Sequence, residues 1–332
     1  MKNFLTTLPF LLACGLASAS PGAESQAPIH PAVAKVPALG TPANRRPVGS
    51  MMAVDFKALV SKADLDLRGP LGDLNNERGL PIGNGRVGTL VWTHPEQSKL
   101  HMQVNHTDVF AFRNSSAAVR DKDGHTYYCN GCGLVDIDFR ENVFAGASVS
   151  NHLPVYDAVA DVAGTGVRTR SLAWHSKDVI AIEVTDERSE PKPITVDLRM
   201  LRQPVEVSGP HTATSTLAAS GADIELSQAF REKADRPLLP DMNFSTALRA
   251  RVLGRAAVVS KPNDQTIRLT APAGKGSLVV LIALGQSKED AFDTVKAAAK
   301  KDLDAAAAAG FAGLLEQNQK YWDGCLVCAV KV

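Results

Sequence analysis

The amino-acid sequence predicts a mainly β protein, an antiparallel super-β-sandwich followed by a short C-terminal helical linker. Between residues 87 and 284, apolar residues recur at every second position in short runs separated by Gly, Pro, Asn and Asp. This is the period of half-buried strands. Roughly ten or more such runs follow one another without a helical pattern between them, which excludes parallel crossover units. After residue 287 the composition changes to Ala, Lys and Asp, which favours helix.

Composition excludes several classes of protein. With 332 residues, 45% of them hydrophobic and 21% charged, the chain can bury a sizeable core in one large domain or two ordinary ones. The 36 Lys and Arg residues are balanced by 35 Asp and Glu residues and form no cluster. Nucleic acid and anionic lipid are therefore not expected as partners. Beyond the N-terminus no apolar run is long enough to span a membrane.

The first residues have the pattern of an export signal. Lys2 precedes an apolar stretch, and Ala17-Ser18-Ala19 follows it, which is the small-x-small pattern of a signal peptide cleaved after Ala19. A secreted or periplasmic protein is expected. The alternative is a lipobox that ends at Cys14, with lipidation of Cys14 and a lipid-anchored protein. The apolar stretch before Cys14 is short, which favours cleavage after Ala19.

Residues 20–62 are predicted to form a Pro/Ala-rich extended linker, because their prolines follow no periodic pattern. The sandwich is predicted at residues 63–286. Its strands are indicated by alternating residues: Leu100, Met102 and Val104; Val135, Ile137 and Phe139; Ile180, Ile182 and Val184; Ile194, Val196, Leu198 and Met200; Leu248, Ala250 and Val252. An Ala-Gly-Thr-Gly turn is predicted between Val162 and Val167. The stretch Leu278–Leu284 is continuously apolar, which predicts a central strand.

Residues 287–332 are predicted to form the helical linker. Ser287 is the expected N-cap, with Glu289 and an aspartate in the first turn, and Gly310 is placed to end the first helix. A second short helix is predicted from Phe311 to about Trp322.

Two motifs carry a resemblance to a known family. Residues 80–88 read LPIGNGRVG, and residues 103–110 read QVNHTDVF. Together they resemble the opening signature of the N-terminal domain of family 95 glycoside hydrolases, which are α-L-fucosidase-like, and of their uncharacterised relatives. Segments 167–171, 174–176 and 179–184 are similar more weakly, so the resemblance covers roughly residues 70–322.

This resemblance implies a super-β-sandwich, a helical linker and then a catalytic (α/α)6 barrel that hydrolyses α-linked sugars such as L-fucose or galactose. A barrel does not follow in this sequence, so the chain is expected to be truncated before its catalytic domain. The catalytic carboxylates of the family lie in the barrel. None of them can be carried over to this chain.

The first motif has a structural and a functional interpretation. Asn84-Gly85 is a turn dipeptide and predicts a hairpin with positive φ at Gly85. The functional interpretation is that Asn84, Arg86, Asn105 and Asp108 bind substrate, since amide, carboxylate and guanidinium groups hold sugar hydroxyls. The motif also matches G-x-G-x-x-G, but it precedes a strand, whereas a dinucleotide motif follows one and opens a helix. No cofactor is expected.

Four cysteines form two C-x-x-C pairs, Cys129 with Cys132 and Cys325 with Cys328. Their spacing allows a four-thiolate zinc site. An oxidising compartment and the long separation between the pairs favour disulfides instead, with Cys129 and Cys132 close enough to pair. Free thiols and a redox-active pair stay open as further interpretations of this spacing, and no metal is expected.

Histidines and acids form no closed constellation in the sequence. The histidines are expected on the surface or on strand faces: His101, His106, His125, His152, His175 and His211. Asp136 and Asp138 share one face of a predicted strand. That face is either solvated or brings two carboxylates within the separation that glycosidases use.

Three functions remain open on the sequence. The first is a non-catalytic N-terminal domain of a secreted glycoside hydrolase-like protein, with a carbohydrate as partner. The second is a free-standing secreted carbohydrate-binding or interaction protein. The third is a small complete hydrolase that uses Asp136 and Asp138. Exposed apolar surface on Phe292, Leu315 and Trp322 would favour the first function over the second.

Overall fold

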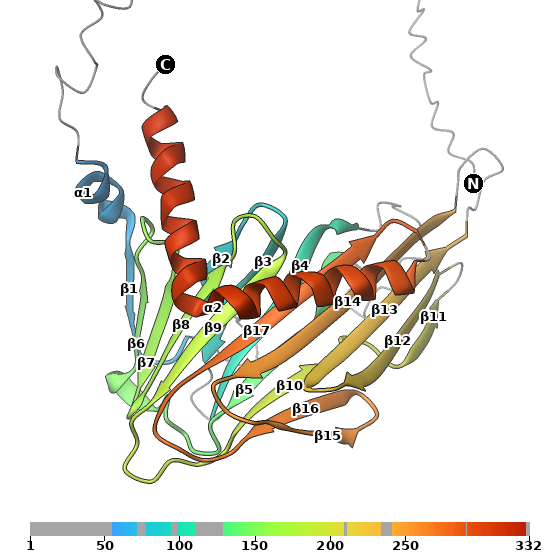
Figure 1. The fold of residues 1–332 in the computed structure, drawn as a ribbon, viewed down its shortest axis with the longest axis horizontal. Helices are drawn as coiled ribbons and strands as arrows, with labels where there is room; N and C mark the ends of the chain where they lie inside the picture. Colours follow the sequence, from blue (N-terminus) through green and yellow to red (C-terminus); the bar gives the residue numbers. More distant parts are fainter. Residues whose placement is uncertain are drawn as a thin grey trace, which may run out of the picture. The chain divides into compact units, whose positions relative to one another are not determined.

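The computed structural model describes residues 55–71, 78–93, 98–110, 129–208, 211–233, 241–289 and 291–329. Two antiparallel sheets pack face to face, which confirms the predicted β-sandwich (Figure 1). The predicted signal sequence, Cys14 and most of the predicted linker lie outside the described residues. The linker's last residues are helical, in α1 (Phe56–Val60) and the 3-10 helix η4 (Ser61–Ala63). Asp55 caps α1 by accepting a hydrogen bond from the backbone N–H of Ala58.

The larger sheet has ten strands in the order β1-β6-β7-β8-β9-β17-β14-β13-β12-β11. Their bounds are β1 (Leu65–Arg68), β6 (Ser150–Leu153), β7 (Ala160–Gly164), β8 (Val167–Ala173), β9 (Val179–Asp186), β17 (Gly276–Ser287), β14 (Met242–Leu253), β13 (Asp223–Glu232), β12 (His211–Ser220) and β11 (Val205–Ser208). The predicted turn between Val162 and Val167 joins β7 to β8, as expected. A short 3-10 helix, η5 (Gly146–Ser148), precedes β6.

The smaller sheet has seven strands in the order β15-β16-β10-β5-β4-β3-β2. Their bounds are β15 (Val258–Asn263), β16 (Thr266–Ala271), β10 (Ile194–Arg199), β5 (Cys129–Asp138), β4 (Lys99–Phe110), β3 (Val87–Thr93) and β2 (Leu80–Gly83). The alternating apolar residues predicted from the sequence lie on one face of each strand. Their side chains form a single core between the two sheets. Phe139, Phe144 and Phe230 are its largest fully buried side chains.

Strand β17 explains why one stretch of the sequence is continuously apolar. It lies in the middle of the larger sheet between β9 and β14, as predicted for Leu278–Leu284. Val280 and Ile282 face the core, whereas Leu281 and Ala283 face the opposite side. That opposite side is covered by the C-terminal helix, so both faces of the strand are buried.

The C-terminal helix α2 (Phe292–Ala329) lies on the outer face of the larger sheet, over β17, β14 and β9 (Figure 1). It bends at Gly310, where φ is 64° and ψ is 171°, a conformation that is essentially confined to glycine. Two helical segments that meet at Gly310 were predicted, and this is confirmed.

The predicted N-cap is wrong. Ser287 is the last residue of β17, and its hydroxyl accepts a hydrogen bond from Glu289, before the helix begins. The chain instead enters the helix against Ser245 of β14. The Ser245 hydroxyl donates to the carbonyl of Glu289 and accepts from the N–H of Ala291.

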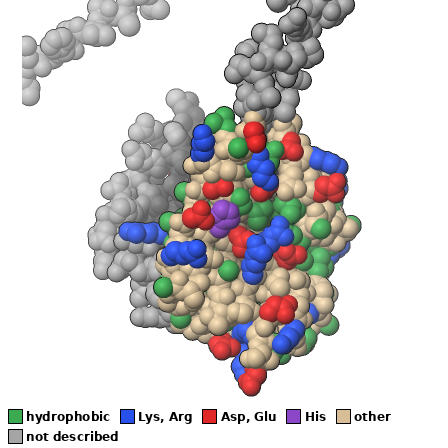
Figure 2. Space-filling model, turned by 90° about the vertical axis from the view of Figure 1, so that its left-hand side faces the viewer, with side chains coloured by type: hydrophobic (Ala, Val, Ile, Leu, Met, Phe, Trp, Pro, Cys, Tyr) green, Lys and Arg blue, Asp and Glu red, His purple; other side chains and the backbone are tan. Residues whose placement is uncertain are grey.

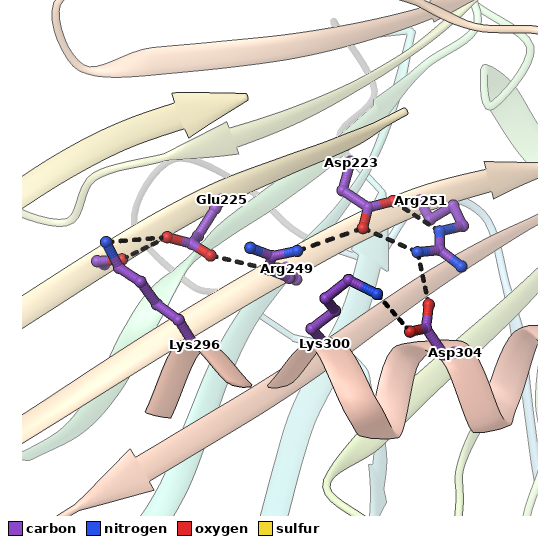
Figure 3. Close-up of polar contacts among 8 residues, drawn as sticks. Asp223, Glu225, Arg249, Arg251, Lys296, Lys300 and Asp304 are labelled. Atoms are coloured by element: carbon purple, nitrogen blue, oxygen red, sulfur yellow. Dashed lines mark hydrogen bonds and ion pairs between the residues drawn. The ribbon is translucent and has the colours of Figure 1, made fainter. Parts of the chain in front are cut away.

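Charged side chains bind the first half of α2 to the sheet (Figure 3). Asp223 and Glu225 of β13 are buried and bind Arg249 of β14 at 3.5 and 2.8 Å. From α2, Lys296 reaches Glu225 at 3.4 Å. Asp304 binds Arg251 of β14 and Lys300 of its own helix, as Figure 3 shows. The pairs made by α2 are partly exposed on the helix side and add little net stability, but they favour one position of the helix on the strands.

The face on the side of β1 carries Lys and Arg interspersed with Asp and Glu, and neither sign forms a continuous patch on the described part of this face (Figure 2). This agrees with the balanced charge of the sequence. In the part of the chain that the structure describes, no helix is both long and apolar enough to cross a membrane.

Gly285 of β17 provides a test of how closely α2 packs on the sheet. A Cβ at this position would lie 2.0 Å from the carbonyl oxygen of Val295. We expect Gly285→Ala to lower the free energy of unfolding by about 3 kcal/mol, because the helix must move outward. Urea denaturation measures this loss. Gly313→Ala is the matched control, since its Cβ would meet Ala309 at an ordinary 3.5 Å; equal stability of the two variants would contradict the close packing.

Candidate functional site

The first sequence motif forms the β2–β3 hairpin. Its turn has Gly85 at φ 89°, which confirms the predicted positive φ. The Asn84 side-chain oxygen accepts hydrogen bonds from the backbone N–H groups of Arg86 and Val87, at 2.9 and 3.0 Å. The turn is therefore closed by the side chain of the residue that begins it.

The other end of the Asn84 amide holds a second loop. Its nitrogen donates to the carbonyl oxygens of Trp174 and Lys177, at 2.8 and 2.9 Å. These carbonyls belong to the loop 174–178 between β8 and β9. Both protons and both lone pairs of the Asn84 side chain are thus used within the protein. Asn84 shapes its surroundings and has no hydrogen-bonding capacity left for a ligand.

Asp178, at the end of this loop, is the partner of two motif residues. Arg86 donates from Nε to Oδ1 at 2.8 Å, and Nε2 of His106 lies 3.2 Å from Oδ2. Nδ1 of His106 accepts from the N–H of Asp108, so a neutral His106 donates to Asp178 through Nε2. Burial disfavours the charged form of Asp178, but the hydrogen bonds from His106 and Arg86 outweigh it and lower the pKa of this carboxyl.

The same loop contacts the second half of α2. Asn318 accepts from the N–H of His175 at 2.8 Å and donates to the carbonyl of Ala173 at 2.7 Å. The Trp174 indole donates to Gln317 at 3.1 Å. The rings of His175 and Tyr321 stack 4.6 Å apart. The loop 174–178 therefore connects the hairpin to the helix.

A hollow of about 360 Å³ lies beside the hairpin. Its wall includes three glycines of the motif, Arg86 and Leu90, together with residues 105–107 of β4. Asn105 accepts from Gln103 through Oδ1 at 3.1 Å, while its amide nitrogen makes no hydrogen bond within the described residues. Arg86 and Asn105 are therefore the two predicted substrate-binding candidates that the fold brings to one hollow.

Asp108 is placed elsewhere. It does not line the hollow, and its carboxylate accepts from Gln286 at 3.2 Å and lies 3.7 Å from Lys288, near the end of β17. Of the four candidate residues, Asn84 and Asp108 thus do not line the hollow.

The face that carries Asp136 and Asp138 is not solvated, which corrects one sequence-based expectation. Asp136 is 2% exposed and binds His101 at 2.9 Å and Arg199 at 2.5 Å. Asp138 is also buried, and it accepts from Ser98 and from the N–H of Arg140. Side chains from neighbouring segments cover this face. They supply each buried carboxylate with at least one hydrogen-bond donor.

The electrostatics of Asp136 do not suit a general acid. Burial raises its pKa, but the hydrogen bonds from His101 and Arg199 and their charges reverse the shift and lower the pKa to about 2. A glycosidase acid needs a raised pKa so that it holds a proton near neutral pH. Asp136 is ionised there and is fixed to an arginine.

The histidines in the described ranges lie on strand faces, in a loop or on the surface. His101 and His106 are on faces of β4, as expected, and are buried there against Asp136 and Asp178. His152 is on the surface as expected, next to Asp66, and His175 is stacked on α2. His125 and the side chain of His211 lie outside the described residues. Within the described ranges, no three His, Cys, Asp or Glu side chains are grouped to hold a metal ion.

Cys132 is completely buried, and burial raises the pKa of its thiol to about 12. A thiol that stays protonated at neutral pH is a poor nucleophile. The side chains of Cys129, Cys325 and Cys328 lie outside the described residues. The pairing of Cys129 with Cys132, and the zinc and redox interpretations of the cysteines, stay predictions.

Solved structures that match part of this chain include the following two. One is a human-microbiome protein that its name assigns as a kojibiose phosphorylase, with 13% identity and a TM-score of 0.46 over 73% of this chain and 35% of that chain. The other is the GH92-family glycosyl hydrolase ccman5, with 13% identity and a TM-score of 0.36 over 77% and 36%. This chain spans little more than a third of either protein.

No family model and no curated protein matches the sequence. Both structural neighbours are named as enzymes that act on sugars. A link to family 95 is not shown by these comparisons.

Substitution of Gly85 tests the hairpin. A Cβ at this position meets no atom within 4 Å, so the cost of Gly85→Val comes from the positive φ alone. We expect a loss of about 1 to 3 kcal/mol in the free energy of unfolding. Gly85→Asn is the control and is expected to cost less, because Asn tolerates positive φ. A valine variant with an unchanged melting temperature would show that the turn does not need this conformation.

The low pKa of Asp136 predicts an acid-sensitive contribution to stability. Its folded-state pKa lies below the ordinary value, so its contribution is present above pH 4 and is lost as the pH falls through about 2. At pH 6 we expect Asp136→Asn to be less stable by about 2 kcal/mol, and this difference to shrink toward pH 2. Urea denaturation at several pH values measures it, with the exposed Asp264→Asn as control. A difference that does not change with pH would contradict the assignment.

Proposed function

We propose that this chain is a non-catalytic N-terminal domain of a secreted glycoside hydrolase-like protein of the family 95 type, and that it binds a saccharide in the hollow beside the β2–β3 hairpin. The motifs that resemble the family form the hairpin and the wall of this hollow. Export rests on the signal pattern before Ala19.

The convergence of Arg86 and Asn105 at one hollow carries the proposal. They lie on different segments of the chain, and the pairing of β3 with β4 brings them together. A guanidinium and an amide offer hydrogen-bond donors to sugar oxygens. Leu90, which is 38% exposed, offers the apolar contact that a sugar ring also needs. The volume of about 360 Å³ lies within the range of small-molecule sites.

Two observations support a non-catalytic role. Among the described residues that line the hollow there is no Asp or Glu, whereas glycoside hydrolysis uses a pair of carboxyl groups. The buried Asp136, with its low pKa, is unsuited to act as an acid. The small-hydrolase function therefore receives no support from this carboxylate.

One observation favours the free-standing carbohydrate-binding protein as a second candidate. Phe292, Leu315 and Trp322 are each half-buried, and Leu315 packs against the cluster between α2 and the sheet. They do not present the exposed apolar surface that a missing domain would leave. Both candidates share saccharide binding at the hollow.

Saccharide binding and turnover are measured on the same purified chain. We expect fucose-, galactose- and arabinose-containing oligosaccharides, screened by NMR, to shift the signals of residues 83–90 and 105–107. Asn105→Ala should weaken the best ligand about tenfold, by the loss of a buried hydrogen bond. Lys261→Ala, on the exposed part of β15, is the control and should bind normally.

No hydrolysis of aryl α-L-fucoside, α-galactoside or β-arabinoside is expected. Activity that survives repurification and disappears in Asp136→Asn or Asp138→Asn would contradict the non-catalytic role. Absence of any saccharide binding would contradict the proposed function itself.

A further inference from the structure

We propose that the hollow selects a saccharide unit that carries an anionic group, and that Arg86 binds this group. The inference rests on the proposed function and names the class of sugar. Arg86 binds Asp178 through Nε and also forms part of the wall of the hollow.

Only one edge of the Arg86 guanidinium is used by the protein. Nε donates to Asp178 at 2.8 Å, whereas neither Nη atom has a hydrogen bond to any described residue. The side chain is 46% exposed and forms part of the wall of the hollow. The two Nη atoms therefore keep their hydrogen-bonding capacity for a ligand in the hollow.

The guanidinium is also held in position before a ligand arrives. Asp178 is fixed from its other side by the buried His106, and its loop is fixed by Asn84. An arginine that is oriented in this way loses less side-chain entropy on binding. Its two Nη donors match the two oxygens of a carboxylate or a sulfate in a bidentate contact.

Among the described residues, the remaining wall of the hollow carries no negative charge that would repel an anionic ligand. Among the described lining residues Arg86 is the sole formally charged side chain, apart from the titratable His106. The Asn105 amide nitrogen is a second donor without a hydrogen bond in the described part of the chain. The hollow therefore offers hydrogen-bond donors from Arg86 and Asn105 and no lining carboxylate. This favours a ligand group with several acceptor oxygens. Uronates carry carboxylates and sulfated sugars carry sulfates, and both have this chemistry.

The experiment compares matched oligosaccharides on the full chain by isothermal titration calorimetry. The probes are a galacturonate trisaccharide, a sulfated galactose trisaccharide and neutral galactotriose. We expect at least one anionic probe to bind about tenfold more tightly than the neutral one, which corresponds to one charge-assisted contact. The arm that binds more tightly identifies the group as carboxylate or sulfate.

Variants test whether Arg86 causes the preference. Arg86→Gln should abolish it, and Arg86→Lys should retain part of it, because a lysine keeps the charge but loses the bidentate geometry. Lys261→Gln is the control and should keep the full preference. Melting temperatures check that Arg86→Gln remains folded after it loses its bond to Asp178.

The outcomes separate the two proposals. Equal binding of neutral and anionic probes, or a preference that survives in Arg86→Gln, overturns the anionic inference and leaves saccharide binding intact. Failure of all three probes to bind overturns the anionic inference, and the wider oligosaccharide screen then decides whether the proposed saccharide binding also fails. The comparison of probes on the unaltered chain decides the question even where a variant does not fold.

Discussion

The side chain of Asn84 makes four hydrogen bonds to the backbone, two within its own turn and two to the loop 174–178. Much of the candidate site depends on these bonds. On one side the loop presents Asp178 to Arg86 and to His106. On the other side it presents the backbone and ring of His175 to α2. One amide thus links a hairpin of the smaller sheet to the helix that covers the larger sheet.

The two halves of α2 share an apolar cluster with the sheet but differ in their polar contacts. The half before Gly310 uses the ion pairs of Lys296 and Asp304 together with buried apolar residues that include Leu303 and Ala306. The half after Gly310 uses apolar contacts and the hydrogen bonds of Asn318. The first half depends on strands of the sheet itself. The second half depends on the loop that Asn84 holds. Lys177 of this loop also binds Asp302 in the first half at 2.8 Å, but the first half keeps its other contacts with the sheet, so a change at the hairpin is expected to affect mainly the second half.

Local patterns in the sequence predict the local features well. Alternation predicts the strands, a continuously apolar run predicts β17, and single glycines predict the hairpin and the bend of α2. Each of these follows from the geometry of a few neighbouring residues. The boundary between β17 and α2 near Ser287 is harder to predict from the sequence. The hydroxyl that binds the backbone just before the helix belongs to Ser245, which lies in a different strand.

The site itself could not be derived in this way. Asn84 contacts residues about 90 positions further along the chain, and Asp178 follows no pattern that marks it as their shared partner. The alternation around Asp136 is equally compatible with a wet face and with a polar face closed by Arg199. The structure shows the closed face. Interactions across distant segments depend on how the sheets pack, which local periodicity does not specify.

Hydrogen exchange in Asn84→Asp tests the central claim most directly. The carboxylate has the shape of the amide but cannot donate to the carbonyls of Trp174 and Lys177. The account predicts faster amide exchange in loop 174–179 and in α2 from residue 311 to 322, with residues 292–309 still protected. Asn84→Ala, which also removes the acceptor for Arg86 and Val87, should additionally loosen the turn. Unchanged protection of the loop and of residues 311–322 in Asn84→Asp would contradict the account.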